Sequence, residues 1–298
     1  MKRVKCPVKM DLSFEDVPSG FCSMPYASDP EGYDVAFCSI SCELPAKGFA
    51  GSADGAAYIR KNVFSYGNVD QPLDIDVGNS IKSADLGKIL VDPSSQESIL
   101  EGIREGMLTI LNKGAIPYVF GGNDASAAAQ IAAMAEKFGK FAAIAFTGSL
   151  SDSLMAAIAD GTADGKNCIQ IGVRDNIAPY AEALSGTNVL TASQMDYMTF
   201  DEIAEKVKSV AGSLPVLVLF QANFPDPAFV PAAVYPCVGG FSEYETVVML
   251  EKSLVGTDIR MCAVYGLLQA KDSGEVAVGN MSEIITKLHA VIGMNLTA

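Results

Sequence analysis

Residues that could carry out chemistry stand directly after three apolar runs of the sequence, at 116–120, 141–146 and 216–220. Such runs are typical of strands buried on both faces of a parallel sheet, and open α/β folds bind their ligands at the carboxyl ends of these strands. Oxygen ligands for one Mg²⁺ or Ca²⁺ ion could come from Asp124, Ser149, Ser151, Gln221 and Asn223. Sites for these ions normally contain several carboxylates, so the set predicts a polar pocket without a metal.

The chain contains a single histidine, His289, which limits the possible catalytic chemistry. A Ser-His-Asp or Cys-His arrangement would have to use it. His289 stands at the edge of an apolar stripe in the final predicted helix, close to Ile285 and Leu288. We therefore interpret it as a structural or interface residue.

The predicted elements alternate between strands and helices, which indicates a three-layer α/β/α fold around a mainly parallel sheet of about eight strands. Possible helix N-terminal caps are Ser94-x-x-Glu97, Thr199-x-x-Glu202 and Asn280-x-x-Glu283. We expect an N-terminal arm at 1–32 and a single domain at 33–298. Strands are expected at 33–40, 116–120, 141–146, 168–174, 189–190, 216–220 and 257–265, with a strand end near 73–79. One helix is expected from the Ser94 cap to about residue 112. Further helices are expected at 56–62, 125–137, 200–211 and 243–254, and from Asn280 onward.

Composition excludes several classes of partner. The net charge is −14, with charged residues spread along the chain and no acidic or basic tail, which argues against binding to nucleic acid or to anionic membranes. No apolar run is long enough for a transmembrane span, and the basic start lacks the apolar core of a signal peptide. Seven scattered cysteines are expected to be reduced thiols in a cytoplasmic protein: Cys6, Cys22, Cys38, Cys42, Cys168, Cys237 and Cys262.

Three segments resemble motifs of the ureohydrolase (arginase/agmatinase/formiminoglutamase) family, and the likeness extends over about residues 33–293. The strand 168–174 is similar to the family's Q-I-G-I-R, and Gly55, Ile59 and Arg60 match its G-P-x-x-I-R. The signature D-P-x-x-x-P, followed by P-x-x-G-G-x-x-x-x-E, is matched by Asp226, Pro227, Pro231, Pro236, Gly239, Gly240 and Glu245. The resemblance implies the arginase-like α/β fold.

Family members use two Mn²⁺ ions, held by four aspartates and two histidines, to make a hydroxide that attacks the guanidinium carbon. The resemblance places Met261 where the family has a glutamate that contacts the substrate. It also implies that the six former ligand positions lining the pocket are Asp124, Thr147, Ser149, Ser151, Gln221 and Asn223. Because only Asp124 carries a charge, we expect no metal, no cofactor and no catalytic residues here.

These substitutions predict an arginase-like protein without ureohydrolase activity, a pseudoenzyme that serves as a binding, regulatory or structural subunit. The family's assemblies imply a homotrimer, with a hexamer or a mixed oligomer with an active relative as further possibilities. One alternative is hydrolysis of a guanidino or amidine compound at an atypical metal site. Another is new chemistry in the same pocket, with Asp124 as a lone base.

Overall fold

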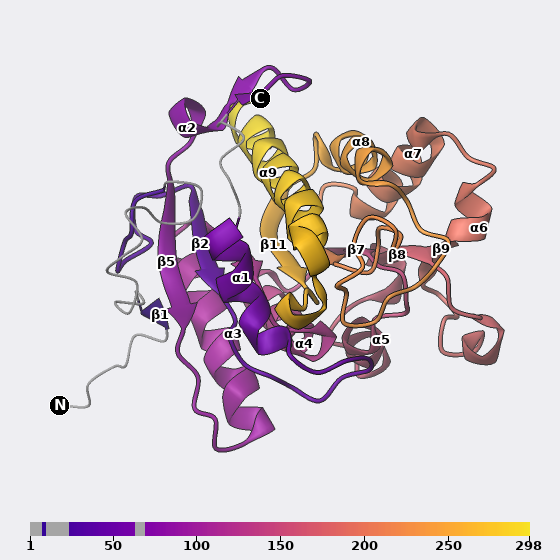
Figure 1. Cartoon of the computed structure of the whole chain (residues 1–298), viewed down its shortest axis with the longest axis horizontal. Coiled ribbons are helices and arrows are strands. Elements are labelled where there is room, and N and C mark those ends of the chain that lie inside the picture. The colour runs from indigo at the N-terminus through magenta and orange to yellow at the C-terminus, as the bar shows by residue number, and fades with distance from the viewer. Residues whose placement is uncertain (1–7, 10–23, 63–68) are drawn as a thin grey trace.

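The computed structural model describes residues 8–9, 24–62 and 69–298. Within them a nine-stranded sheet crosses the molecule in the order β1-β5-β2-β6-β11-β10-β7-β8-β9 (Figure 1). Only β1 (Val8–Lys9), at one edge, is antiparallel to its neighbour, so the predicted parallel sheet of about eight strands is confirmed. The parallel strands are β2 (Val35–Ser39), β5 (Ser83–Ile89), β6 (Ile116–Phe120), β7 (Ala142–Phe146), β8 (Cys168–Val173), β9 (Asn188–Thr191), β10 (Val216–Gln221) and β11 (Ile259–Tyr265).

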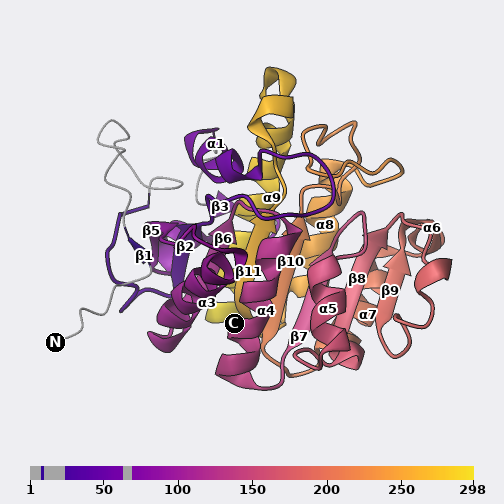
Figure 2. The ribbon, with the colours of Figure 1, turned by 90° about the horizontal axis from the view of Figure 1, so that it is seen from below.

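Helices cover both faces of this sheet and complete the predicted three layers (Figure 2). One face packs against α3 (Gln96–Asn112), α4 (Asp124–Phe138) and α5 (Asp152–Ala159). The other face packs against α1 (Gly55–Asn62), α7 (Phe200–Ala211), α8 (Glu243–Leu254) and α9 (Val276–Thr297), and two one-turn helices, α2 (Val77–Ser80) and α6 (Ala192–Met195), lie at its margins.

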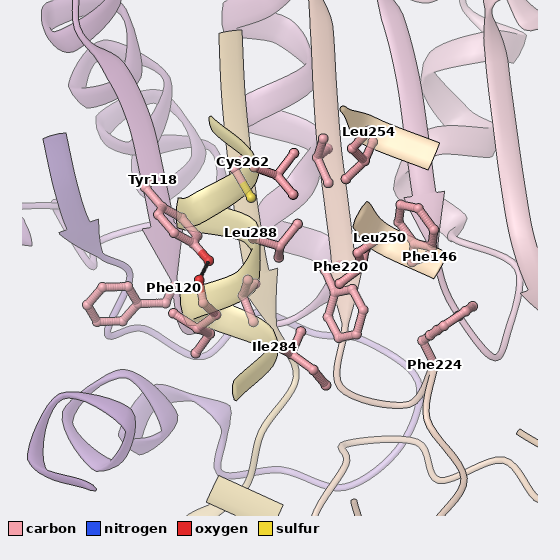
Figure 3. Close-up of a cluster of buried hydrophobic side chains, with 14 of the residues drawn as sticks. Tyr118, Phe120, Phe146, Phe220, Phe224, Leu250, Leu254, Cys262, Ile284 and Leu288 are labelled. Carbon is pink, nitrogen blue, oxygen red and sulfur yellow. Dashed lines mark hydrogen bonds between the residues drawn. The ribbon is translucent and has the colours of Figure 1, made fainter. Parts of the chain in front are cut away.

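The central strands are buried from end to end, as their continuous apolar sequences require. Aromatic side chains fill the layer beneath the carboxyl ends of β7 and β10 (Figure 3). The ring of Phe224 lies edge-on to Phe146, with 5.5 Å between the centroids, and 5.7 Å from the ring of Phe220. These rings fix the last residue of β7 and the penultimate residue of β10, and thereby position the polar residues that follow.

Several predicted boundaries are wrong. Residues 73–79 do not end a sheet strand, because β4 (Ile75–Asp76) forms a small hairpin with β3 (Val69–Asp70) and continues into α2. The sheet strand that follows, β5, was not expected at all. The cap of α3 is Ser95, one residue later than predicted, and α9 begins at Val276, so Asn280 lies inside it. The capping box at Thr199 is confirmed, with both of its hydrogen bonds present.

The N-terminal arm at 1–32 lies largely outside the described residues. Its described part runs along β5, where the backbone of Asp85 donates to Pro25 O and accepts from Ala27 N. In the described part of the chain the cysteines are free thiols, whereas Cys6 and Cys22 lie outside it. No helix among the described residues is long and apolar enough to cross a bilayer.

His289 belongs to α9, and its side chain is buried in the core against the sheet. Its Nε2 lies 2.9 Å from Ser83 Oγ, and its ring meets Phe37 edge-on with 4.9 Å between centroids. Burial disfavours the charged imidazolium and lowers the pKa of His289 to about 3. The neutral ring is therefore a structural group.

This histidine should make the protein sensitive to mild acid. Because its pKa is lower in the folded than in the unfolded state, the unfolded chain binds the extra proton below about pH 6.5, and stability falls as the pH falls. Between pH 7.5 and pH 5 this group alone should cost about 2 kcal/mol. Urea unfolding at both pH values should show that His289→Gln loses correspondingly less stability than the wild type. Equal losses in the two proteins would contradict the assignment.

Candidate active site

A cavity of about 230 Å³ opens where β6, β7 and β10 end. Its floor carries Asp124, Ser149 and Gln221, and its mouth carries the more exposed Lys47 and Asp152. The carboxyl ends of neighbouring parallel strands meet at one edge of a sheet, so residues distant in sequence converge here. Three of the six predicted positions, Asp124, Ser149 and Gln221, line this cavity, whereas Thr147, Ser151 and Asn223 are buried and are not among its lining residues.

Four of the six predicted residues form one hydrogen-bond network. Thr147 Oγ1 lies 2.6 Å from the carbonyl oxygen of Ser149 and 2.7 Å from Gln221 Oε1, so its proton can be donated to either of them. Asn223 accepts from Gly148 N through Oδ1 at 2.8 Å and donates through Nδ2 to Ser149 Oγ at 3.0 Å. These hydrogen bonds link the four side chains across the ends of β7 and β10.

The other two residues, Asp124 and Ser151, form a second network on the α4 and α5 side. Ser151 Oγ donates to the Asp124 carboxylate at 2.6 Å, with further donors from Ser153 N at 3.1 Å and Tyr265 OH at 3.4 Å. Burial raises the pKa of Asp124, and these hydrogen bonds only partly oppose that shift. A carboxylate with a raised pKa is suited to general base catalysis.

Met261 does not lie in the cavity, so its prediction as a substrate-contact position is wrong. It stands in the middle of β11 opposite Leu217 and is fully buried in the core against α3 and α4. The strand continues for four more residues, and the residue after it, Gly266, lies beside Gln221. Aligning the family motif by sequence alone placed the substrate-contact position too early in β11.

Sequence reasoning also missed three contributors to the site. Tyr265, at the end of β11, donates to Asp124, and Gln170 in β8 accepts from Ser151 N at 2.8 Å. Lys47 reaches the mouth from the loop between β2 and α1 and pairs with Asp152. Tyr265 could have been predicted as a site residue, because it stands at the carboxyl end of a predicted strand. Lys47 could not, because only the fold brings its loop to the cavity.

The signature loop after β10 is held by Asp226. Its carboxylate accepts hydrogen bonds from the backbone N–H groups of Ala228, Gly239 and Gly240 at 2.9, 2.7 and 2.9 Å. Partial burial raises the pKa of Asp226, but the three N–H donors outweigh it and the net pKa is lowered. The motif therefore acts by fixing the loop's shape.

The loop after β7 is held by Arg174, whose guanidinium donates to carbonyl oxygens on neighbouring segments. Its Nη1 bonds to Phe224 O at 2.8 Å and its Nη2 to Asn223 O and to Cys237 O, while its backbone N bonds to Gly148 O at 2.9 Å. These bonds tie three site segments together.

Gly148 leaves no room for a side chain at this junction. A Cβ atom there would lie 2.4 Å from both Arg174 Nη2 and Asn223 O. We expect Gly148→Ala to lower the free energy of unfolding by about 1–3 kcal/mol, as overpacking does, and to displace the Thr147–Asn223 network. Gly279→Ala is the matched control in urea unfolding, because nothing lies within 4 Å of that site in α9, and it should be neutral or stabilising. Equal effects of both changes would refute the close packing.

The Arginase family model matches residues 33–288. The chain belongs to the arginase family. The agmatinase of Serratia proteamaculans (strain 568) is 26% identical over 267 residues, covering 85% of this chain and 84% of that protein.

Solved structures of arginase-family members share the fold. A hypothetical agmatinase from Burkholderia thailandensis superposes with a TM-score of 0.86 at 23% identity, covering 94% of this chain and 92% of that one. The Trypanosoma cruzi formiminoglutamase with Mn²⁺ gives a TM-score of 0.80 at 19% identity, covering 91% and 96%. The arginase-like fold predicted from the sequence is confirmed.

These relatives overturn the predicted function. A chain that aligns with named agmatinases over most of both lengths is related to hydrolases, so the prediction of an inactive subunit that is not an enzyme is wrong. Weighing the six altered positions above the remaining family signal caused the error. The findings favour the alternative, hydrolysis of a guanidino or amidine compound.

The side chains present do not fit a pair of manganese ions. Mn²⁺ prefers carboxylate and imidazole ligands, whereas the six positions hold one carboxylate and no imidazole. At Asn223, Nδ2 points a donor at Ser149 Oγ, and Thr147 and Gln221 are hydrogen-bonded to each other. Within 8–9, 24–62 and 69–298, no group of three or more His, Cys, Asp or Glu residues could hold a metal ion.

Proposed function

We propose that the protein is a hydrolase that cleaves a C–N bond of a guanidino or amidine compound. The observation that carries this proposal is the alignment with agmatinases over 85% of the chain. A cavity with a carboxylate on its floor, at the carboxyl ends of the central strands, is consistent with it. Agmatine, a guanidino amine, is the first candidate substrate.

The cavity floor offers acceptors for a planar cation. Asp124 Oδ1 and Oδ2 and the amide oxygen of Gln221 can receive the N–H groups of a guanidinium or amidinium. Ser151 and Tyr265 keep the Asp124 carboxylate in place, and Thr147 does the same for the amide of Gln221. The floor therefore holds the central carbon of the guanidinium or amidinium group close to the carboxylate of Asp124.

Asp124 is the residue proposed to move the proton. Water adds to the amidinium carbon as Asp124 takes its proton, and the proton then passes to the leaving nitrogen as the C–N bond breaks. A guanidino substrate thus gives urea and an amine. The raised pKa of Asp124 brings its basicity closer to neutral pH, where such transfer is efficient.

The proposal is tested by turnover. The purified protein is incubated with agmatine, L-arginine, 4-guanidinobutyrate and N-formimino-L-glutamate, both with added Mn²⁺ and after treatment with chelator, and urea, ammonia and formamide are measured. We expect release from at least one compound. Absence of release from all four by a protein that unfolds cooperatively would overturn the proposal.

Assembly and location stay predictions. A homotrimer, a hexamer or a mixed oligomer with an active relative can be distinguished by light scattering and co-purification. A cytoplasmic location is likewise the proposal that follows from the sequence.

A further inference from the structure

An ion pair closes the mouth of the cavity. Lys47 Nζ lies 2.8 Å from Asp152 Oδ1, and the two side chains are 53% and 59% exposed. Lys47 lies on the loop between β2 and α1, and this loop reaches α5 in Figure 1. Asp152 is the first residue of α5, directly after Ser151, which bonds to Asp124 on the floor. The pair thus lies at the outer end of the same cavity.

The backbone on both sides of Lys47 is pinned. Asn123 Nδ2 donates to Leu44 O at 2.7 Å, and Phe49 N donates to Val234 O at 2.8 Å. A Cβ atom at Gly48 would lie 2.2 Å from Val234 O, so the loop presses directly on the neighbouring segment. Any movement at the mouth therefore falls to the side chain of Lys47 rather than to the loop.

The charges at the mouth differ in mobility. Asp152 has a short side chain on the first turn of a helix, so its carboxylate stays near the cavity. Lys47 has a flexible four-carbon stem and can turn into solvent, and an exposed ion pair of this kind contributes little to stability. When Lys47 turns out, the cavity lining keeps the carboxylates of Asp124 and Asp152 and loses the one cation among the described residues that line it.

We propose that Asp152 is a specificity-determining residue that binds the distal ammonium of a guanidino amine, and that Lys47 occupies this place when no substrate is bound. This inference rests on the proposed function for its substrate class. The dication meets one carboxylate at each end: its guanidinium meets Asp124 on the floor and its ammonium meets Asp152 at the mouth. The ammonium group of the substrate replaces that of the lysine.

A guanidino acid fits this arrangement poorly. Its distal carboxylate would have to draw Lys47 away from Asp152 and would then lie beside the Asp152 carboxylate, whose short side chain keeps it close to the start of α5. Two carboxylates side by side repel each other. The cavity is therefore expected to select a cationic tail over a neutral one, and a neutral tail over an anionic one.

Three ligands with the same head group test the inference: agmatine, butylguanidine and 4-guanidinobutyrate. Dissociation constants are measured at low temperature by ligand-observed NMR, which needs no turnover. The wild type should bind agmatine more tightly than butylguanidine, and Asp152→Asn should weaken agmatine about tenfold while leaving butylguanidine unchanged. Lys47→Met removes the competing cation and should tighten agmatine binding several-fold.

Lys166→Met is the matched control, because Lys166 forms a similarly exposed pair with Asp164 away from the cavity, and it should change none of these constants. If agmatine and butylguanidine bound equally well, both to the wild type and to Lys47→Met, the inference would be overturned. It would also be overturned if the wild type bound 4-guanidinobutyrate more tightly than agmatine and Lys47→Met lost that preference. Turnover without preference for a cationic tail would refute the inference but leave the proposed function. Binding that follows the expected order without any turnover would refute the proposed function but leave the inference about Asp152.

Discussion

Asp85→Ala is expected to lower the free energy of unfolding by about 3–5 kcal/mol, the usual cost of removing one partner from a buried ion pair. Asp85 in β5 is fully buried and receives Arg60 Nε at 3.0 Å and Nη2 at 2.9 Å, while the Arg60 side chain is only 6% exposed. The change leaves a guanidinium charge in the core with two donors unpaired. It also removes the acceptor of Gly87 N.

Two further proteins make this measurement decisive. Asp258→Ala breaks the exposed pair with Arg260 and should cost less than about 1 kcal/mol. The double change Arg60→Met/Asp85→Leu removes both charges together and should recover at least half of the loss. Urea unfolding of the four proteins gives the comparison. A cost for Asp85→Ala as small as that for Asp258→Ala would contradict the role of the buried pair.

Asp124→Asn is expected to lower kcat/KM by about 10²–10⁴-fold, the range in which a general base contributes. Asparagine keeps the shape of the side chain and an acceptor for Ser151 Oγ but cannot take a proton from water. Because burial raises the pKa of Asp124, the ionised carboxylate costs stability at neutral pH, and the neutral variant avoids this cost. Its Nδ2 no longer accepts from Ser153 N, which offsets part of the gain, so its free energy of unfolding should stay close to that of the wild type. Loss of activity together with full stability separates a chemical role from a structural one.

The activity control is Asp160→Asn. Asp160 is exposed directly after α5, where it accepts from Thr162 N at 2.9 Å, and it does not line the cavity, so kcat/KM should not change. Initial rates of wild type and both variants on the compound that the wild type turns over are compared from pH 5 to pH 9. If Asp124→Asn stays within threefold of the wild type, Asp124 is not the base.

The sequence predicts this fold well wherever a strand is a continuous apolar run. The strands at 116–120, 141–146 and 216–220 were located within a residue, because burial on both faces leaves no polar interruption. β5 escaped prediction because its sequence contains Asp85, Gly87 and Lys88. The charge of Asp85 is tolerated in the core only because Arg60 neutralises it, and that partner lies 25 residues earlier.

Helix ends could likewise be predicted where local residues determine them, but not where distant residues do. Thr199 caps α7 through Glu202, a signal contained in four consecutive residues. Asn280 carries the same kind of signal, but its side chain donates to Phe229 O at 2.8 Å, and α9 already begins four residues earlier. A partner outside the local segment decided the outcome.

For the candidate site, the six predicted polar residues lie in two hydrogen-bond networks, and three of them, Asp124, Ser149 and Gln221, line the cavity. It misplaced Met261, because the register of β11 against β10 decides which residue reaches the strand end. It could not find Lys47, which enters the cavity from a loop more than 70 residues earlier in the chain than Asp124. It also misjudged the function by taking the altered ligand positions as proof of inactivity.

The place of β11 in the sheet has a consequence for how the chain folds during synthesis. β11 (Ile259–Tyr265) lies between β6 and β10, so it joins the two halves of the sheet. Until this strand has left the ribosome, β6 and β10 each present an unpaired edge, and such edges promote aggregation. The sheet can therefore close only after nearly nine-tenths of the chain has emerged, and pairings between such distant segments form slowly. Nascent chains that stop before Ile259 should accordingly depend on chaperones that shield exposed strands.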